Sequence, residues 1–239
     1  MVHFKQIFNR AVKRKGNKKE LNKLLPNVKS VKLIKSIKDD RVLAAMSKCV
    51  FQAGFSWKVI EKKWPTFETA FHKFSINKLS SLSPDQWDEY GHDTRVVRNM
   101  QKIMSVAHNV SFIADIKKEY KSFGRFIAQW PEDDLVGLFI YLKKHGSRLG
   151  GMTSQILLRR LGKDTFMLTP DVIACIKLTG LSIADHPTSK RDLYAIQNLF
   201  NDLRDNTKLP YSHLSRIMSC SIGSNYPVDQ IVKAMSVSA

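Results

Sequence analysis

The sequence predicts an all-α protein, because helix signals recur along most of its 239 residues and strand signals are nearly absent. Apolar residues return at the three- and four-residue spacing of a buried helix face. Ser, Thr or Asp marks the start of several segments, and Gly closes them. We expect roughly nine to eleven helices with short connections, preceded by a basic arm.

Five segments carry these signals in the first two thirds of the chain. Apolar residues fall on one helical face in 41–52 and again in 96–110. Residues 83–86, Ser-Pro-Asp-Gln, form a capping box with Pro at the first helical position. A helix is expected over 131–146, with acids near its start and lysines near its end, as the helix dipole favours. A further helix is expected over residues 153–161, and Gly162 should end it.

The last third predicts further helices. Residues 169–171, Thr-Pro-Asp, cap a helix that ends before Gly180. Residues 188–205 carry a helical pattern, and 211–235 predict one or two weaker helices.

The composition is that of a globular chain, with 43% hydrophobic and 25% charged residues. No apolar run is long enough for a membrane span, and the N-terminus lacks the apolar stretch of a secretion signal. Three cysteines without a C-x-x-C pair argue against a disulfide framework or a cysteine zinc site. The common nucleotide-binding, metalloprotease and hydrolase motifs are absent, and seven scattered histidines show no ligand spacing. We expect no metal and no cofactor.

The charge balance favours a polyanionic partner. Lys and Arg exceed Asp and Glu by 39 to 21, and residues 1–38 hold twelve of these cations with one acid, Glu20. Each neutralised phosphate of a nucleic acid releases a condensed counterion, so basic chains bind DNA well. A solubilising surface is the alternative. We therefore divide the chain into a basic N-terminal arm, 1–38, and a helical domain, 39–239.

A glycine turn between two expected helices predicts a site for the DNA backbone. Residues 146–151 join a helix that ends at Gly146 to one that starts near Thr153. Glycines let a ligand approach the backbone, and the N–H groups at a helix start favour phosphate. This is a helix-hairpin-helix layout at about 135–162, although an ordinary pair of helices with glycine caps would look similar. The expected DNA-binding residues are Arg148, Gly150, Gly151, Met152, Thr153 and Ser154, together with Arg98 and Lys102.

An ordered series of motifs resembles one enzyme family. It comprises Q-A-G-F-S-W at 52–57, a Phe-rich stretch at 67–74, the segment 96–103, Asn109, and the hairpin at 142–153. Together these resemble the 3-methyladenine DNA glycosylase I family over residues 42–160. The resemblance implies a two-lobed helix-hairpin-helix fold that hydrolyses the N-glycosidic bond of a base flipped out of the duplex.

The resemblance also implies a base pocket, formed here by Trp57, Gln52, Cys49 and Phe55. A methylated adenine is cationic in DNA, so the indole of Trp57 could hold it by stacking and cation–π attraction. Gln52 could hydrogen-bond a base edge. Core packing is the alternative role for Trp57, and a helix-terminal cap is the alternative for Gln52.

Several positions depart from the family pattern. Cys49 stands where the family has a base-recognising glutamate, and the family's zinc ligands find no match. Asp171, shortly beyond the hairpin, is the candidate catalytic carboxylate, although a first-turn acid that favours the helix dipole is the alternative. Gln155 occupies the place of the Schiff-base lysine of bifunctional relatives, so we expect no strand cleavage.

These features together predict a monofunctional glycosylase for an alkylated purine, acting in base excision repair as a monomer on duplex DNA. A non-catalytic DNA-binding protein with the same fold is the alternative, which Cys49 favours. We expect a bacterial cytoplasmic (nucleoid) or nuclear location, with no secretion and no membrane partner.

Overall fold

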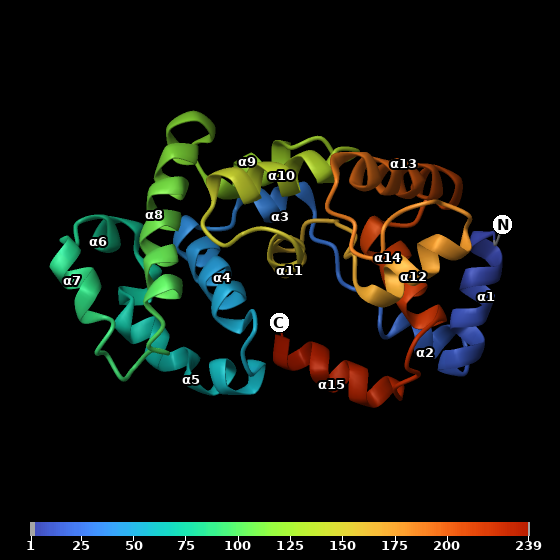
Figure 1. The fold of residues 1–239 in the computed structure, drawn as a ribbon, viewed down its shortest axis with the longest axis horizontal. Coiled ribbons are helices and arrows are strands. Elements are labelled where there is room, and N and C mark those ends of the chain that lie inside the picture. Colours follow the sequence, from blue (N-terminus) through green and yellow to red (C-terminus); the bar gives the residue numbers. More distant parts are fainter. Residues whose placement is uncertain (1–2, 239) are drawn as a thin grey trace. The chain divides into compact units, whose positions relative to one another are not determined.

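The computed structural model describes residues 3–238, which form fifteen α-helices and one short 3-10 helix and contain no strand (Figure 1). This confirms the all-α prediction. None of the helices in these residues has the length and apolarity needed to cross a membrane. The elements are α1 (Phe4–Lys15), α2 (Lys18–Asn22), α3 (Val31–Lys35), α4 (Asp39–Gln52), α5 (Trp57–Ala70), η1 (His72–Phe74), α6 (Ile76–Ser80), α7 (Pro84–Glu89), α8 (Met100–Tyr120), α9 (Phe123–Gln129), α10 (Leu135–His145), α11 (Met152–Leu161), α12 (Pro170–Leu178), α13 (Lys190–Thr207), α14 (Tyr211–Ser221) and α15 (Val228–Ser238).

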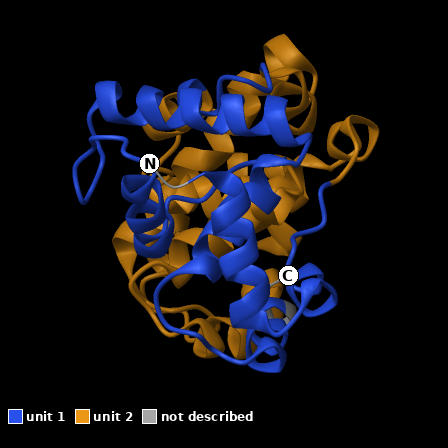
Figure 2. Cartoon of the chain, turned by 90° about the vertical axis from the view of Figure 1, so that its right-hand side faces the viewer, with its two compact units in different colours: residues 1–28, 131–137, 164–239 blue, residues 29–130, 138–163 orange. Residues whose placement is uncertain are grey.

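The chain divides into two compact units (Figure 2). Unit 1 combines residues 1–28, 131–137 and 164–239, and unit 2 contains residues 29–130 and 138–163. Helix α10 begins in unit 1 and continues in unit 2. The boundary expected at residue 38 does not coincide with this division, because the basic segment contributes to both units.

The part of the basic N-terminal segment that the structure describes in unit 1, residues 3–28, is folded and packed. Helix α1 lies against α14 and buries Ile7 and Ala11 completely. Arg14 of α1 donates hydrogen bonds to the carbonyl oxygens of Cys220, at 3.1 Å, and Gly223, at 2.5 Å. Cations favour the carbonyl end of a helix, so this arginine attaches α1 to the end of α14. Part of the N-terminal charge therefore stabilises unit 1 itself.

The start of α14 is held by a carboxylate of the same unit. Asp164 accepts hydrogen bonds from the backbone N–H groups of Tyr211 and Ser212, both at 2.9 Å. These are first-turn donors that the helix itself leaves without partners. Beside them, the rings of Phe166 and Phe200 stack with centroids 4.5 Å apart and form the core of the unit.

Unit 2 is built around α4, which packs on α5, α8, α9 and α11. An aromatic cluster lies beside it, in which Phe51 of α4 meets Phe67 of α5 edge to face at 4.8 Å. Phe67, Phe71 and Phe74 are completely buried. The Phe-rich stretch of the sequence therefore forms the core that supports α4 and α5.

Helix ends agree with the sequence where a cap specifies them. The Ser83 capping box starts α7 as predicted, and Thr169 caps α12. Helix α8 begins at Met100, later than its apolar stripe suggested, because the Asn99 side chain accepts the N–H of Lys102. Helix α10 begins at Leu135 and not at Pro131.

Candidate functional site

The glycine hairpin forms as predicted, between α10 and α11 of unit 2. Gly151 directly precedes α11 with φ 58° and ψ −132°, a conformation that residues with a side chain rarely adopt. A Cβ at this position would meet no other atom within 4 Å. The space beside the Gly151 Cα is therefore open, and the start of a helix favours an anion.

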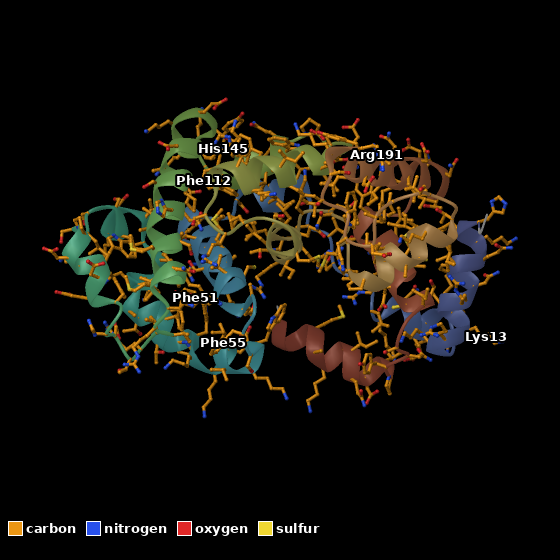
Figure 3. The ribbon with its side chains drawn as sticks, viewed as in Figure 1. Lys13, Phe51, Phe55, Phe112, His145 and Arg191 are labelled. Atoms are coloured by element: carbon orange, nitrogen blue, oxygen red, sulfur yellow. The ribbon has the colours of Figure 1, made fainter. Side chains whose placement is uncertain are left out.

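A buried amide of α8 holds this turn in place. Asn109 is fully buried, accepts the backbone N–H of Ser147 at 2.8 Å and donates to the Ser147 carbonyl at 3.1 Å. Next to it, the ring of His145 at the end of α10 stacks on Phe112 of α8, with centroids 6.5 Å apart (Figure 3). The hairpin is thus fixed to α8, and the Asn109 of the sequence motif acts as its support.

The residues expected to bind DNA occupy different environments. Arg98 and Arg148 are exposed, and Arg148 donates a hydrogen bond to Gln101. Thr153 and Met152 are half-buried in the first turn of α11. Ser154 is completely buried, and its hydroxyl donates to the Gly151 carbonyl.

Lys102 caps a helix. Its ammonium donates to the carbonyl oxygens of Phe51, at 3.1 Å, and Ala53, at 2.8 Å, at the end of α4. Burial, and to a smaller extent the nearby Arg148, lowers the pKa of Lys102. The ammonium also lies 5.9 Å from the ring centre of Phe55, which is 43% exposed on the turn after α4 (Figure 3). Lys102 therefore positions the turn that leads to Trp57.

Three helices meet at the residues expected to form the base pocket. Cys49 and Gln52 of α4 are only 4% and 1% exposed. Arg160 of α11 donates to Cys49 Sγ at 3.2 Å and to Gln52 Oε1 at 2.9 Å. The Gln52 amide donates in turn to Glu61 of α5, at 2.8 Å, and Glu61 forms an ion pair with Lys48 at 2.7 Å. We call these five residues the α4–α5–α11 cluster.

Trp57 is the first residue of α5 and is half-buried. It precedes Glu61 by one helical turn, so both side chains lie on the same face of α5. Because Glu61 contacts Gln52, this face of α5 adjoins the α4–α5–α11 cluster. The spacing thus places Trp57 on the same side of α5 as Glu61, whose carboxylate accepts a hydrogen bond from Gln52.

Asp171 lies in unit 1, in the first turn of α12. The Thr169 hydroxyl caps the same helix by accepting the N–H of Val172. A Cβ at Gly223 would lie only 2.2 Å from the Asp171 carboxylate, so a glycine is needed there. This position agrees with the helix-dipole role, and the catalytic role of Asp171 stays a prediction. The described residues contain no group of three or more His, Cys, Asp or Glu that could hold a metal ion.

Sequence reasoning missed Arg160, Glu61 and Lys48. Glu61 could have been found, because it follows Trp57 by four residues and so shares its helix face. Arg160 lies 111 residues from Cys49 in the chain, and no local pattern joins the two. Only the packing of α11 on α4 brings them together.

The Cys49 thiol is an unsuitable nucleophile. Burial raises its pKa to about 11, although the Arg160 guanidinium acts in the opposite direction. The thiolate is the reactive form, so Cys49 stays protonated at neutral pH.

This shifted pKa predicts a loss of stability at alkaline pH. An unfolded thiol ionises near its ordinary value of 9.0, whereas folded Cys49 ionises near 11. Between pH 9 and pH 11 the folded protein therefore keeps the thiol proton that the unfolded protein loses. In this range the ionisation of Cys49 lowers the free energy of unfolding by about 1.4 kcal/mol per pH unit. Urea unfolding at several pH values should show that the free energy of unfolding falls less steeply with pH in Cys49→Ala than in the natural protein. Equal slopes for both proteins would contradict the assignment.

The chain matches a known protein family over most of unit 2 and part of unit 1. The family model for methyladenine glycosylase matches residues 34–174, which is more than half of the chain and includes both the hairpin and the α4–α5–α11 cluster. The protein is thus of the DNA glycosylase class. The chain belongs to the methyladenine glycosylase family.

Solved structures give a weaker likeness. The 3-methyladenine DNA glycosylase I of Staphylococcus aureus is 20% identical, with a TM-score of 0.47, over 52% of this chain and 77% of that chain. A tyrosine variant of 3-methyladenine DNA glycosylase I, in complex with 3-methyladenine, is 21% identical, with a TM-score of 0.45, over 67% of this chain and 95% of the other.

The hairpin gives a direct prediction for DNA binding. Gly151→Asp places a negative charge where backbone N–H groups are expected to face phosphate, so the affinity for any duplex should fall by about tenfold or more. Gly151→Ala introduces the same backbone strain without the charge and serves as the control. Fluorescence anisotropy with an undamaged duplex measures both. If the aspartate variant binds as tightly as the alanine variant, the hairpin does not contact the backbone.

Proposed function

We propose that the protein is a monofunctional DNA glycosylase that hydrolyses the N-glycosidic bond of an alkylated purine flipped out of duplex DNA. The observation that carries the proposal is the position of α11. This helix begins at the open Gly151 turn and, near its other end, places Arg160 against Cys49 and Gln52. One rigid helix therefore joins the expected phosphate site to the expected base site.

The chain's own residues have separate tasks in this mechanism. The turn before α11 and exposed cations such as Arg148 bind the phosphate backbone without reading sequence. Trp57, half-exposed beside the α4–α5–α11 cluster, stacks on the flipped purine. Gln155 stands where the resemblance places the Schiff-base lysine of bifunctional relatives, so we expect water to attack the sugar. The catalytic role of Asp171, which lies in unit 1, stays a prediction of the sequence.

The burial of Cys49 and Gln52 favours a second candidate function. Their polar groups are bonded inside the protein, to Arg160 and Glu61, as they would be in a protein whose pocket had been filled. In this case the protein would bind duplex DNA without removing a base.

Alkali treatment separates these candidates on one substrate. A fluorescent duplex is methylated, incubated with protein and run on a denaturing gel with and without alkali. The proposed glycosylase leaves abasic sites, so protein-dependent strand breaks should appear only after alkali. Breaks without alkali would contradict the monofunctional assignment. Tight binding without breaks in either lane would support the non-catalytic candidate.

A further inference from the structure

Helix α1 of unit 1 directs three cations at uncharged groups. Arg14 donates to backbone carbonyl oxygens at and after the end of α14. Lys15 is only 7% exposed and donates to the Asn225 side chain and the Tyr226 carbonyl, both at 2.9 Å. Arg10 donates to a serine hydroxyl of α14, at 3.4 Å. None of these three cations forms an ion pair with an acidic residue in the part of the chain that the structure describes, so the fold does not neutralise their charge.

The cations between α1 and α14 repel one another. Burial lowers the pKa of Lys15, against an opposing effect of Cys220, and the neighbouring Arg14 and Arg216 lower it further. Burial also lowers the pKa of Arg216 on α14, and the Nε atom of this arginine is buried without a hydrogen-bond partner. Like charges held close together cost free energy, which negative charge at the nearby surface would reduce. This part of unit 1 therefore favours an anionic partner.

The other side of α1 carries further cations that face solvent. Lys5 and Lys13, the latter labelled in Figure 3, are both exposed. Each lies two residues from the completely buried Ile7 or Ala11, and two residues turn an α-helix by about 200°, so the lysines point away from the core. Together with two exposed lysines at the start of α2 they form what we call the α1–α2 lysine surface: Lys5, Lys13, Lys18 and Lys19.

No carboxylate of the described residues neutralises the α1–α2 lysine surface. Glu20 is the only acid in residues 3–28, and it pairs with Lys23 at 2.6 Å. The four lysines of the surface form no ion pair within residues 3–238. The surface also lies outside the part of the chain that the methyladenine glycosylase model matches, which begins at residue 34. Its charge is therefore an addition to the family's domain.

The extent of this surface favours a polyanion. Eight residues separate Lys5 from Lys13, which corresponds to about 12 Å along the helix axis. One strand of a DNA duplex places about three phosphates over such a length, so the two ammonium groups can bind separate phosphates. Lysine binds phosphate as a point charge and reads no base sequence. No large apolar side chain in residues 3–28 is exposed, so the surface lacks the apolar face with which a helix enters a lipid bilayer.

We propose that the α1–α2 lysine surface binds the phosphate backbone of duplex DNA, as a contact of unit 1 additional to the hairpin of unit 2. This contact goes beyond the proposed function, because it requires neither a flipped base nor a broken bond. It raises the affinity for damaged and undamaged duplex alike, since both carry the same backbone.

The salt dependence of duplex affinity tests the proposal. Fluorescence anisotropy with an undamaged duplex is measured at several KCl concentrations for the natural protein, for Lys5→Gln/Lys13→Gln and for Lys18→Gln/Lys19→Gln. Each phosphate contact that is lost should make the slope of log affinity against log salt shallower by about 0.9. We expect each double variant to lose about one to two contacts and roughly tenfold in affinity at low salt.

Matched variants control for total charge and for folding. Lys190→Gln/Lys208→Gln removes two exposed lysines from the ends of α13, also in unit 1, and should keep the natural slope. Lys5→Arg/Lys13→Arg keeps both charges and should keep the affinity. Because every substituted lysine is exposed, thermal unfolding should be the same in all these proteins. Unchanged slopes in both α1–α2 variants, or an equal change in the α13 variant, would overturn the proposal.

Two further measurements separate the proposal from a membrane role and from the proposed function. If the α1–α2 variants bind phosphatidylserine vesicles more weakly but keep the natural duplex slope, the surface binds membranes and the proposal is wrong. The alkali assay is run on the same proteins. A shallower slope in variants of a protein that leaves no abasic sites would refute the glycosylase function and support the contact. Normal formation of abasic sites with unchanged slopes would support the function and refute the contact.

Discussion

The Trp57→Ala variant should release the alkylated base tenfold to a hundredfold more slowly than the natural protein, with little change in its affinity for undamaged duplex. Loss of one base-stacking interaction is worth about 1 to 3 kcal/mol. Trp57 is half-buried at the first position of α5, so its removal leaves the core of unit 2 in place. Single-turnover excision and thermal unfolding on the same preparation measure the two effects.

The same variant distinguishes stacking from packing. A fully buried tryptophan would cost about 3 to 5 kcal/mol of folding stability when truncated. A strongly destabilised variant whose folded fraction excises normally would therefore assign Trp57 to the core. Trp57→Phe keeps an aromatic ring of smaller area and should show only a partial defect in excision.

Asn109→Ala should lower the free energy of unfolding by about 2 to 4 kcal/mol, because it leaves the N–H and the carbonyl of Ser147 without their buried partner. The hairpin turn would then lose its attachment to α8. We expect duplex affinity to fall by about tenfold even at temperatures where the variant is fully folded. Chemical unfolding and anisotropy measure these two losses.

Two further variants serve as controls for the predicted loss of duplex affinity and stability. Asn109→Asp keeps an acceptor for the Ser147 N–H but cannot donate to the Ser147 carbonyl when ionised, so it should lie between the natural protein and the alanine variant. Asn99→Ala removes an amide from the start of the same helix α8 and should cost only about 1 kcal/mol, as a lost helix cap does. If Asn109→Ala binds DNA normally while fully folded, the turn does not need this support to bind DNA.

Local chemistry made much of the helical structure predictable. The Ser83 capping box and the Thr169-Pro170 start each specify a helix end through a side-chain hydrogen bond, and both appear in the structure. The Gly151 turn was predictable because glycine is the residue that adopts its backbone angles without strain.

The N-terminal helices were not predicted, because their charge hides a short apolar pattern. Residues 4–35 form α1, α2 and α3, and the apolar side chains that they bury are few, among them Ile7, Ala11 and Leu21. Arg14 acts inside the fold, on carbonyl oxygens of residues more than 200 positions away. Deletion of residues 1–38 would therefore remove part of unit 1, and charge changes at exposed lysines test DNA contacts better.

The candidate site was predictable only in part, because some of its residues come from positions distant in the chain. The Q-A-G-F-S-W motif located Gln52 and Trp57, but the charged partners of Gln52 come from α5 and α11. The contact of Arg160 with Cys49 exists only after α11 has packed on α4. A local motif predicts some residues of a site, whereas the charged partners of these residues are known only from the tertiary structure.

The most direct test of glycosylase activity is the identification of the free base. The purified protein is incubated with duplex DNA that carries a panel of alkylated purines, and the released bases are identified by liquid chromatography and mass spectrometry. We predict the release of a free alkylated purine by the natural protein and a tenfold to hundredfold slower release by Trp57→Ala. Tight duplex binding with no free base from any member of the panel would contradict the assignment.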